Sequence, residues 1–398
     1  MKRKISISQA LALVLGAAVL TFFVTAVCFQ TAFGIRIGDS AARGSIYSKV
    51  YEVEELLREN FYAELDNQAL QDGLLTGMVE SLGDQYSLYL DREEFSSVYS
   101  EINGQAQNMG ISLLYDGESG YPKVISVEPN SGAAAAGLRA GDLICRIGAE
   151  DCRELGYEAA LEKLQGEEGT TTEFVVLRGG EELAVSVTRK AYAKQLVTYR
   201  MLEHQVGYLK IEAFDVGAAD AFRTALTELQ NQGAVGIIFD VRDNPGGELE
   251  TVCSILDTIL PEGPIVRLNY RDHTETKESD AACLELPHAV LINGSTYSAA
   301  ELFAAAVKDY GIGTIVGETS YGKGRMQTMI PLSDGTGVNV TVATYDPPKS
   351  ENFDGVGVQP DITVTLPDEV KSHYYEKTDE EDAQLQAAIA AVTGAQKE

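Results

Sequence analysis

An apolar run from Ala10 to Phe29 opens the chain, directly after basic residues at positions 2–4. About 20 apolar residues suffice for a helix to cross a bilayer. No clear small-x-small cleavage site follows, so we expect a retained transmembrane anchor at residues 9–30 rather than a cleaved signal peptide. Lys and Arg residues next to a transmembrane helix usually stay on the cytoplasmic side of the membrane. We therefore expect residues 1–8 to be cytoplasmic and the remainder to be extracytoplasmic, at the cell surface or in a periplasm-like space. Cleavage would instead release a secreted protein.

Apolar residues recur at helical spacing in the next segment, residues 41–103, which predicts amphipathic helices. The tyrosine-rich stretch at residues 85–90 then breaks the pattern. It contains no reactive constellation, and we interpret it as a packing or dimerisation element. The residues at helical spacing include Ile46, Val50, Val53, Leu56 and Leu57, then Leu70, Leu74, Leu75 and Met78.

Short strands and glycine turns follow in residues 104–191, centred on residues 124–144. The pattern predicts a strand, a proline turn, a one-turn alanine helix ended by Gly137, and a Gly141-Asp142 turn into another strand. This order resembles a PDZ domain of the bacterial protease type, which implies a small β-barrel-like domain.

The resemblance to PDZ domains implies a peptide-binding edge. PDZ domains add an extended C-terminal peptide to a sheet edge and hold its carboxylate with backbone N–H groups. The corresponding loop here is Gly110, Ile111 and Ser112, ahead of the strand that begins at Leu113. Ser112 stands where a second glycine is usual. We therefore expect these residues to contact substrate tails.

Strands and helices alternate from residue 192 to residue 366, which predicts an α/β layered domain. The acidic segment 367–398 has a short apolar face and is expected to be a docking helix or a frayed end. The whole chain is thus expected to be an α/β (α+β) multidomain protein. The expected core strands are 207–211, 235–241, 265–270, 289–292, 314–316, 326–331 and 338–345, and the helices are 218–230, 248–260 and 298–310.

The amino-acid composition argues against several classes of partner and cofactor. Acidic residues outnumber basic ones 60 to 31, and the net charge of -29 opposes binding to nucleic acid or electrostatic adsorption to anionic lipid. The four histidines are scattered singly, and no Cys-x-x-Cys or His-Glu-x-x-His pattern occurs. We therefore expect no metal, no cofactor and no nucleic-acid partner.

Five cysteines are present, and Cys28 lies in the expected anchor. Cys145 with Cys152, and Cys253 with Cys283, could pair in an oxidising compartment, but spacing does not establish connectivity. Small buried hydrophobes are an equally good interpretation of these cysteines.

Ser298 has two interpretations that use the same geometry. Ser298-Ala-Ala-Glu301 before an apolar helix fits a capping box, in which the serine caps amide groups and the glutamate reaches back. Alternatively, a serine on a tight turn, between Gly294 and Ala299, would stand clear of its neighbours as a nucleophile. The N–H of Ala299 and the helix dipole could then stabilise an oxyanion.

Lys323 is the strongest candidate for the base that a nucleophilic serine needs. Gly322 and Gly324 allow its backbone to approach a neighbouring element closely, and Gln327 is placed to orient its amine. The lysine must be neutral, so burial would have to lower its pKa from about 10.4 toward about 7–8. Arg325 would act in the same direction if it faced the site.

Two other interpretations of this region are weaker. His288, the nearest histidine, begins the strand that leads into the serine turn. The stretch from Gly317 to Lys323 matches the G-x-x-x-x-G-K pattern of a phosphate-binding loop. However, Gly324 replaces the Ser or Thr that would hold magnesium, and a strand is predicted next instead of a helix. We therefore expect no bound nucleotide.

The motif Asn244-Pro-Gly-Gly247 ends a buried strand and supplies a candidate second oxyanion donor. Pro245 and Gly246 fit the middle of a type II turn, which exposes successive backbone N–H groups. Alone this motif is only a turn. Together with Ser298 and Lys323 it provides the missing acceptor of negative charge.

The Asn244–Gly247 motif, the Ser298 turn and the Lys323 segment follow one another along the chain. In this order and spacing they resemble those of the carboxyl-terminal processing (tail-specific) proteases, and the resemblance covers about residues 46–365. The resemblance implies a core of the ClpP/crotonase-like type in residues 192–366. It also implies the roles of site residues: Ser298 as nucleophile, Lys323 as general base, Gln327 as its orienting partner, Gly246 or Gly247 with Ala299 as oxyanion hole, and Asp309 as a structural residue. Departures from the family pattern are Tyr297, Asp243 and the turn Pro347-Pro348-Lys349, which bear on substrate preference more than on mechanism.

The resemblance implies a membrane-anchored serine endopeptidase that cuts proteins near their C-termini, with a PDZ domain that recognises exposed tails and regulates activity. It also suggests a homodimer. The competing hypothesis is a non-catalytic PDZ scaffold or a pseudoprotease that binds peptides. The joint presence of Ser298, Lys323 and Gln327 argues against it, because a binder needs none of them.

Overall fold

The computed structural model describes residues 40–102, 109–117, 119–192, 194–371, 374 and 377–394. It divides into two compact units, Met1–Leu74 and Leu75–Glu398. The expected anchor at residues 9–30 lies outside the described residues. Within the described ranges, the structure contains no helix that is both long and apolar enough to cross a bilayer.

The first unit contains α2 (Ser40–Asn60) and the beginning of α3 (Asn67–Glu80). The predicted helical periodicity is confirmed, but its apolar face remains open to solvent: Ile46 is 58% exposed and Leu56 54%. An apolar cavity of about 760 Å³ is lined by residues of both helices, including Val50, Leu57 and Leu70. The unit therefore does not bury its own apolar surface.

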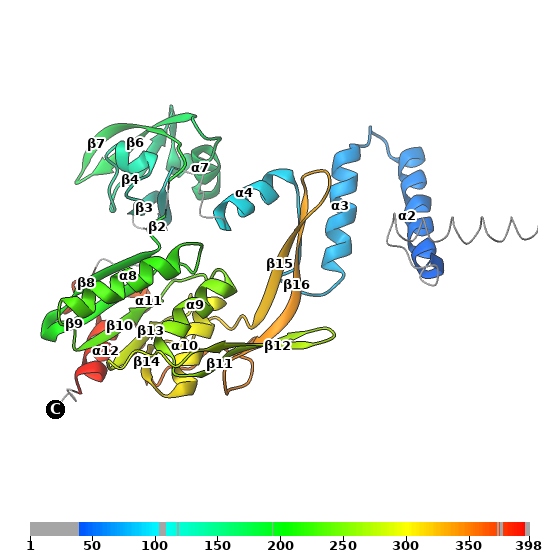
Figure 1. Cartoon of the computed structure of the whole chain (residues 1–398). Coiled ribbons are helices and arrows are strands. Elements are labelled where there is room, and N and C mark those ends of the chain that lie inside the picture. The colour runs from blue at the N-terminus through cyan, green and yellow to red at the C-terminus, as the bar shows by residue number, and fades with distance from the viewer. Residues whose placement is uncertain are drawn as a thin grey trace, which may run out of the picture. The chain divides into compact units, whose positions relative to one another are not determined.

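The PDZ segment folds as one sheet with three short helices (Figure 1). Its strand order is β2-β3-β4-β6-β7, with β5 beside β4, so among the strands that the structure describes β2 is an edge strand that pairs on one side only. Val124, Ile144 and Val176 are fully buried in its core. The strands are β2 (Ile111–Asp116), β3 (Tyr121–Val127), β4 (Leu143–Ile147), β5 (Glu150–Asp151), β6 (Thr171–Arg178) and β7 (Glu181–Thr188), and the helices are α5 (Gly132–Ala135), α6 (Cys152–Leu155) and α7 (Tyr157–Leu164).

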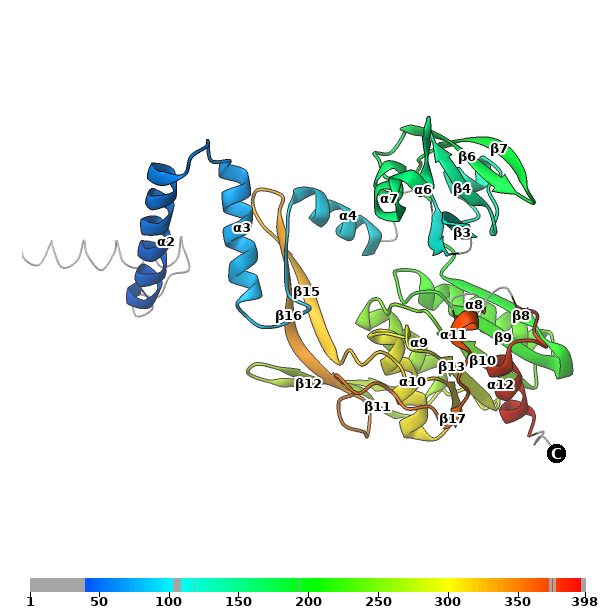
Figure 2. The ribbon, with the colours of Figure 1, turned by 180° about the vertical axis from the view of Figure 1, so that it is seen from behind.

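The core contains a largely parallel sheet with the order β17-β14-β13-β10-β9-β8. Side chains of a strand alternate between its two faces. Accordingly, Ile237 and Phe239 pack with α8, α9 and α10, whereas Ile238 packs with α12. The predicted layered α/β arrangement is therefore confirmed, with helices on both faces of the sheet (Figure 2). The elements are β8 (Val197–Met201), η2 (Glu203–Gln205), β9 (Val206–Ile211), α8 (Ala218–Asn231), β10 (Gly236–Asp240), α9 (Leu249–Ile259), β13 (His288–Ile292), α10 (Ala299–Tyr310), β14 (Gly313–Gly317), β17 (Ile362–Thr363), α11 (Asp368–Lys371) and α12 (Ala383–Thr393).

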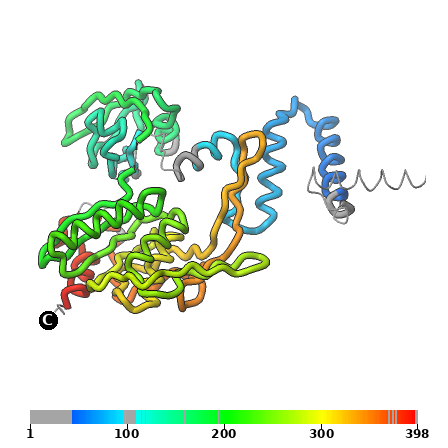
Figure 3. The backbone as a smooth tube through the Cα atoms, viewed as in Figure 1, coloured from blue at the N-terminus to red at the C-terminus, as the bar shows by residue number. Residues whose placement is uncertain are grey.

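A second, antiparallel sheet of the core has the order β1-β16-β11-β12, with β15 also paired to β16. The backbone trace shows β15–β16 and β11–β12 as two long hairpins (Figure 3). The strands are β1 (Leu88–Leu90), β11 (Gly263–Tyr270), β12 (Thr274–Ser279), β15 (Arg325–Pro331) and β16 (Gly337–Asp346), and α4 (Arg92–Ile102) follows β1. The tyrosine-rich stretch is thus a packing element, since β1 pairs with β16.

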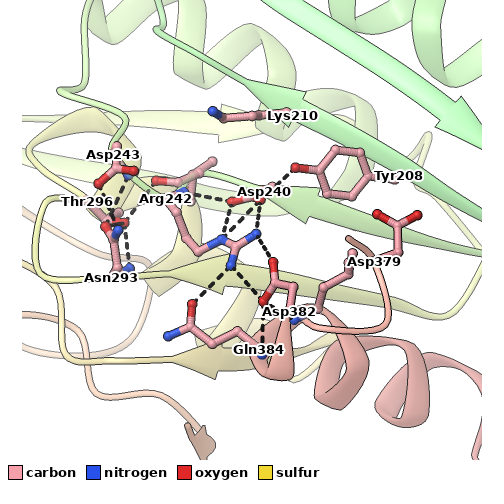
Figure 4. Close-up of polar contacts among 12 residues, drawn as sticks. Tyr208, Lys210, Asp240, Arg242, Asp243, Asn293, Thr296, Asp379, Asp382 and Gln384 are labelled. Atoms are coloured by element: carbon pink, nitrogen blue, oxygen red, sulfur yellow. Dashed lines mark hydrogen bonds and ion pairs between the residues drawn. The ribbon is translucent and has the colours of Figure 1, made fainter. Parts of the chain in front are cut away.

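The apolar face of the C-terminal segment docks on the core instead of fraying. Leu385, Ala388 and Val392 of α12 are buried against the parallel sheet. At the start of this helix, the Asp382 carboxylate lies 2.9 Å from the Arg242 guanidinium, which also contacts Asp240 at 2.6 Å (Figure 4). This buried network connects α12 to the chain just ahead of the Asn244–Gly247 turn.

The cysteines of the described chain are free thiols in this structure. Cys145, Cys152 and Cys253 are buried, and Cys283 is exposed. Burial raises the pKa of Cys152 to about 11 and that of Cys253 to about 12. Neither pairing considered from the sequence is formed here, and the buried thiols fill core space.

Candidate active site

Ser298 lies on a strained turn between β13 and α10. Its backbone has φ 56° and ψ -119°, a conformation that costs a non-glycine residue about 1–3 kcal/mol. Two hydrogen bonds hold the turn: the Ser298 N–H donates to the Glu301 carboxylate at 2.9 Å, and the Tyr297 N–H donates to the Asn244 carbonyl at 3.0 Å. The glutamate half of the predicted capping box is therefore present. The half-buried serine side chain is presented at the N-terminus of α10.

Lys323 lies in the loop between β14 and β15, and its ammonium group contacts two aromatic rings. Nζ is 4.7 Å from the ring centre of Tyr297 and 4.8 Å from that of Tyr86. Burial lowers the pKa of Lys323, while the charges of Asp84 and Glu301 oppose this shift. Among the described residues, no hydrogen bond joins Lys323 Nζ to the Ser298 hydroxyl. Lowering of the pKa is the direction that a lysine base requires.

Gln327 contacts Thr341 in this structure instead of the lysine. Its side-chain amide donates to the Thr341 hydroxyl at 3.0 Å, and that hydroxyl donates to Asp84 at 2.5 Å. Arg325 pairs with Asp84 at 3.0 Å and with Asp354 at 2.8 Å. Because these carboxylates balance its charge, Arg325 does not lower the pKa of Lys323, which is the effect considered from the sequence.

Tyr345 was not anticipated from the sequence as part of this region. Its buried hydroxyl donates to the Lys323 carbonyl at 2.6 Å, and the Ser298 side chain interacts with the same hydroxyl in the direction that lowers its pKa. Burial raises the pKa of Tyr345, so it stays a neutral phenol. The phenol therefore links the serine to the backbone of the lysine.

The Asn244–Gly247 turn lies directly against the serine. A Cβ added to Gly246 would come within 2.9 Å of Ser298 Cβ and 3.0 Å of the Ala299 nitrogen. The N–H of Gly246 is already engaged, since it donates to Asn244 Oδ1 at 2.8 Å. In the part of the chain that the structure covers, the N–H groups of Gly247 and Ala299 donate to no protein acceptor. They are the two donors that remain available to an oxyanion.

The base of this turn is joined to the serine turn by paired side chains (Figure 4). Asn293 donates to the Asp243 carboxylate at 2.8 Å, and the Asp243 N–H donates back to Asn293 Oδ1 at 3.0 Å. Asp243 has φ 59°, a left-handed conformation that Asn and Asp tolerate better than other residues. An aspartate at position 243 is therefore compatible with this conformation.

Asp309 lies away from the reactive groups and binds the turn that departs from the family pattern. Its carboxylate accepts hydrogen bonds from the N–H groups of Lys349 at 2.7 Å and Ser350 at 2.8 Å. The Asp309 carboxylate thus holds the backbone of this turn in place.

The two weaker interpretations receive no support from the geometry. His288 is buried at the opposite end of β13 from the serine turn and packs edge-on against Phe239. The N–H groups of Gly322 and Lys323, which would face a phosphate in a phosphate-binding loop, donate instead to the Glu301 carboxylate. A carboxylate in that place excludes an anionic phosphate.

The PDZ loop residues lie at the start of β2. Gly110 has φ 78°, and a Cβ there would come within 2.0 Å of Ser131 Cβ, so glycine is required. Ile111, Ser112 and Leu113 pair with β3 on one side, and no described strand pairs with the other side of β2. The Tyr157 hydroxyl of α7 donates to the Leu113 carbonyl at 3.0 Å. A peptide added at this edge would compete with Tyr157.

Sequence reasoning did not identify Asp84, Tyr86 and Tyr345 as neighbours of the lysine, and it described Glu301 only as a helix cap. Tyr86 lies in the tyrosine-rich stretch and Asp84 directly precedes it, in a part of the chain that the family resemblance covers. That coverage was the one available signal of a role beyond packing.

Three family models match the chain: peptidase family S41 at residues 205–364, the activating protease CtpB N-terminal domain at residues 35–94, and a PDZ domain at residues 123–178. A carboxyl-terminal-processing protease of Synechocystis is 31% identical over 349 residues, covering 85% of this chain and 81% of that protein. A carboxy-terminal-processing protease of Bartonella bacilliformis is also 31% identical, covering 82% and 77%. Among solved structures, a photosystem II D1 C-terminal processing protease matches with a TM-score of 0.52 and 27% identity, over 79% of this chain and 86% of that one.

Proposed function

Since this chain belongs to the carboxyl-terminal processing proteases of peptidase family S41, which are serine peptidases, we propose that Ser298 is its nucleophile and Lys323 its general base. The observation that carries the assignment is that three segments meet: the Ser298 turn, the Asn244–Gly247 turn packed on it, and the Lys323 loop. The backbone N–H groups of Ser298 and Lys323 both donate to the Glu301 carboxylate. A chain that only bound peptides would need no such meeting.

The proposed reaction has two halves. Neutral Lys323 takes the proton of the Ser298 hydroxyl as its oxygen attacks the scissile carbonyl, and the N–H groups of Gly247 and Ala299 hold the oxyanion. The lysine ammonium then protonates the departing amine, which leaves an acyl ester on Ser298. Water, deprotonated by the same lysine, hydrolyses that ester and restores the free serine.

The free chain requires one rearrangement before this reaction. Cation–π contacts with Tyr86 and Tyr297 favour the charged lysine, and among the described residues no hydrogen bond joins Nζ to the Ser298 hydroxyl. Catalytic hydrogen bonds are often long in free enzymes and tighten when substrate binds. We infer that bound substrate turns the lysine side chain from the rings toward Ser298, where Gln327 orients it.

The rate of cleavage is expected to rise with pH. Burial lowers the pKa of Lys323 from its ordinary 10.5, so the neutral amine becomes populated at lower pH than for a free lysine. The rising limb of kcat/KM should therefore have its midpoint below 10.5, and the limb should be lost in Lys323→Met. Steady-state assays from about pH 6 to about pH 10 measure this. A wild-type rate that falls over this range would contradict a lysine base.

Replacement of Gly246 by alanine is expected to lower kcat/KM by about 100-fold or more. The new Cβ would press on Ser298 and Ala299, and the φ of 96° strains any side chain. Gly77→Ala is the matched control, because its Cβ would meet nothing within 4 Å and its φ is ordinary. Equal activity of both variants would show that the turn does not contact the site.

The PDZ domain is proposed to select substrates by their free C-termini and to regulate cleavage. The open edge of β2 supports this, since an extended tail can add there once Tyr157 leaves the Leu113 carbonyl. An unstructured protein with a free C-terminal carboxylate should be cleaved at least about tenfold faster than the same chain amidated, which corresponds to about 1.4 kcal/mol of binding. Equal rates would refute tail recognition and leave proteolysis standing.

Location and assembly are further parts of the proposal. Residues 9–30 anchor the chain with its catalytic part outside the cytoplasm, as their apolar run supports. The exposed apolar face of α2 supports a homodimer. Release of the full-length protein from membranes by alkaline carbonate would overturn the anchor, and a monomer mass in sedimentation would overturn the dimer.

A further inference from the structure

Glu301 lies in the first turn of α10 and has 0% of its surface exposed. A buried carboxylate persists only where hydrogen-bond donors replace water. The identity of those donors therefore shows which parts of the chain this side chain holds together.

Donors from two separate segments saturate the carboxylate. Oε2 accepts from the backbone N–H of Ser298 at 2.9 Å and from that of Lys323 at 2.8 Å. Oε1 accepts from the N–H of Gly322 at 2.6 Å and from the Ser320 hydroxyl at 2.5 Å. A carboxylate offers about four lone-pair sites, so these bonds use its capacity. One oxygen atom thus joins the backbones of the serine and the lysine.

Helix capping alone does not explain this arrangement. A cap requires only the contact with Ser298, whereas the other donors come from the loop between β14 and β15. That loop is also held elsewhere: the Tyr345 hydroxyl donates to the Lys323 carbonyl at 2.6 Å, and the Val358 N–H donates to the Ser320 hydroxyl at 2.6 Å. The lysine backbone is therefore bound at both its N–H and its carbonyl, which leaves its side chain as the part that moves.

We propose that Glu301 is a positioning residue, which keeps the backbones of Ser298 and Lys323 at a fixed separation so that only the lysine side chain turns toward the serine. This inference rests on the proposed function of those two residues. Glu301 itself touches no substrate. A displacement of about 1 Å in a catalytic site can lower the rate on the order of 100-fold, so the loss of this link has a large effect.

If Glu301 acted only through its negative charge, the expected effect of removing it at high pH would differ from that of a positioning role. The charged and titratable groups around the carboxylate are Lys323, Tyr297 and Tyr345. Burial lowers the pKa of Lys323 and the Glu301 charge raises it, so removal of that charge alone would favour the neutral base. Activity would then move to lower pH with no loss at high pH. A positioning role predicts a loss that persists where the lysine is already neutral.

Full-length Glu301→Gln separates these roles, because the amide keeps the size of the side chain but turns an NH2 group toward backbone donors. We expect kcat to fall about 100-fold or more at every pH up to about 10. KM for a free-tail substrate should stay within about threefold of wild type, because substrate contacts are unchanged. A kcat within about threefold of wild type at about pH 10 would overturn the inference.

A second variant keeps the test decisive if Glu301→Gln fails to fold. Ser320→Ala removes one side-chain donor and leaves the backbone intact, and kcat should fall about 3-fold to 10-fold with KM unchanged. Unchanged kcat in this folded variant would also overturn the inference. Ser298→Ala is measured in parallel: if it still cleaves, the proposed function itself fails, whereas an inactive Ser298→Ala beside a fully active Glu301→Gln refutes only the positioning role.

Discussion

Ser298→Ala is expected to lower kcat/KM for an unstructured protein substrate by about 10⁶-fold, the loss typical of removing a catalytic serine. The change deletes the attacking oxygen and little else. The Ser298 N–H bond to Glu301 belongs to the backbone and remains, so the turn should keep its shape. Thermal unfolding should therefore stay within a few degrees of wild type, which separates lost chemistry from lost folding.

Ser295→Ala is the matched control for this variant. Ser295 lies on the same turn, is exposed and should be replaceable without loss. Addition of Lys323→Met to Ser298→Ala should lower the rate little further, because residues that act as one unit are not additive. If Ser298→Ala retains more than about a tenth of the wild-type rate, the serine is not the nucleophile.

Arg242→Met is expected to lower the free energy of unfolding by about 3–5 kcal/mol. The Arg242 side chain is 2% exposed and pairs with Asp240, which is 0% exposed, and with Asp382 at the start of α12. Without the guanidinium, two buried carboxylates remain uncompensated. The expected fall in melting temperature is about 6–20 °C for a domain of this size, measured by calorimetry.

Arg200→Met provides the comparison for Arg242. Arg200 pairs with Asp379 of the same C-terminal segment, but this pair is 46% and 40% exposed, and such surface pairs contribute about 0–1 kcal/mol. Similar melting temperatures for the two variants would show that the buried network does not hold α12.

Acid should weaken the buried network. Burial by itself raises the pKa of Asp240, but the charge and hydrogen bonds of Arg242 outweigh burial and lower it below the ordinary 3.8. A carboxyl whose folded-state pKa is lowered stabilises the fold above its unfolded pKa and loses that effect as pH falls through the folded value. The stabilisation is therefore complete at neutral pH and disappears only in strong acid.

The features predicted well from the sequence are those that depend on neighbours along the chain. The helix after Ser298 and the buried strand before Asn244 follow from local periodicity, and α12 follows from its apolar face. The glycines around Lys323 indicated a close approach to a neighbouring element. A Cβ added to Gly322 would meet the backbone of residues 355–357, and a Cβ added to Gly324 would meet the Asn352 side chain.

The features that the sequence did not predict depend on contacts between segments that are far apart along the chain. Strand β12 has a wholly polar sequence, so nothing in its pattern predicted a strand, and β1 forms only by pairing with β16. The contact of Tyr86 with Lys323 likewise joins residues far apart in the chain. Periodicity reports which face of an element is buried, but not which partner covers it.

The most direct measurement is the mass of the enzyme quenched in acid during turnover of a peptide substrate, followed by mapping of any modified residue. An ester adduct is expected on Ser298, with the mass of the N-terminal substrate fragment less one water, and it should form more slowly in Lys323→Met. A substrate adduct on any other residue would contradict the assignment of Ser298 as the nucleophile.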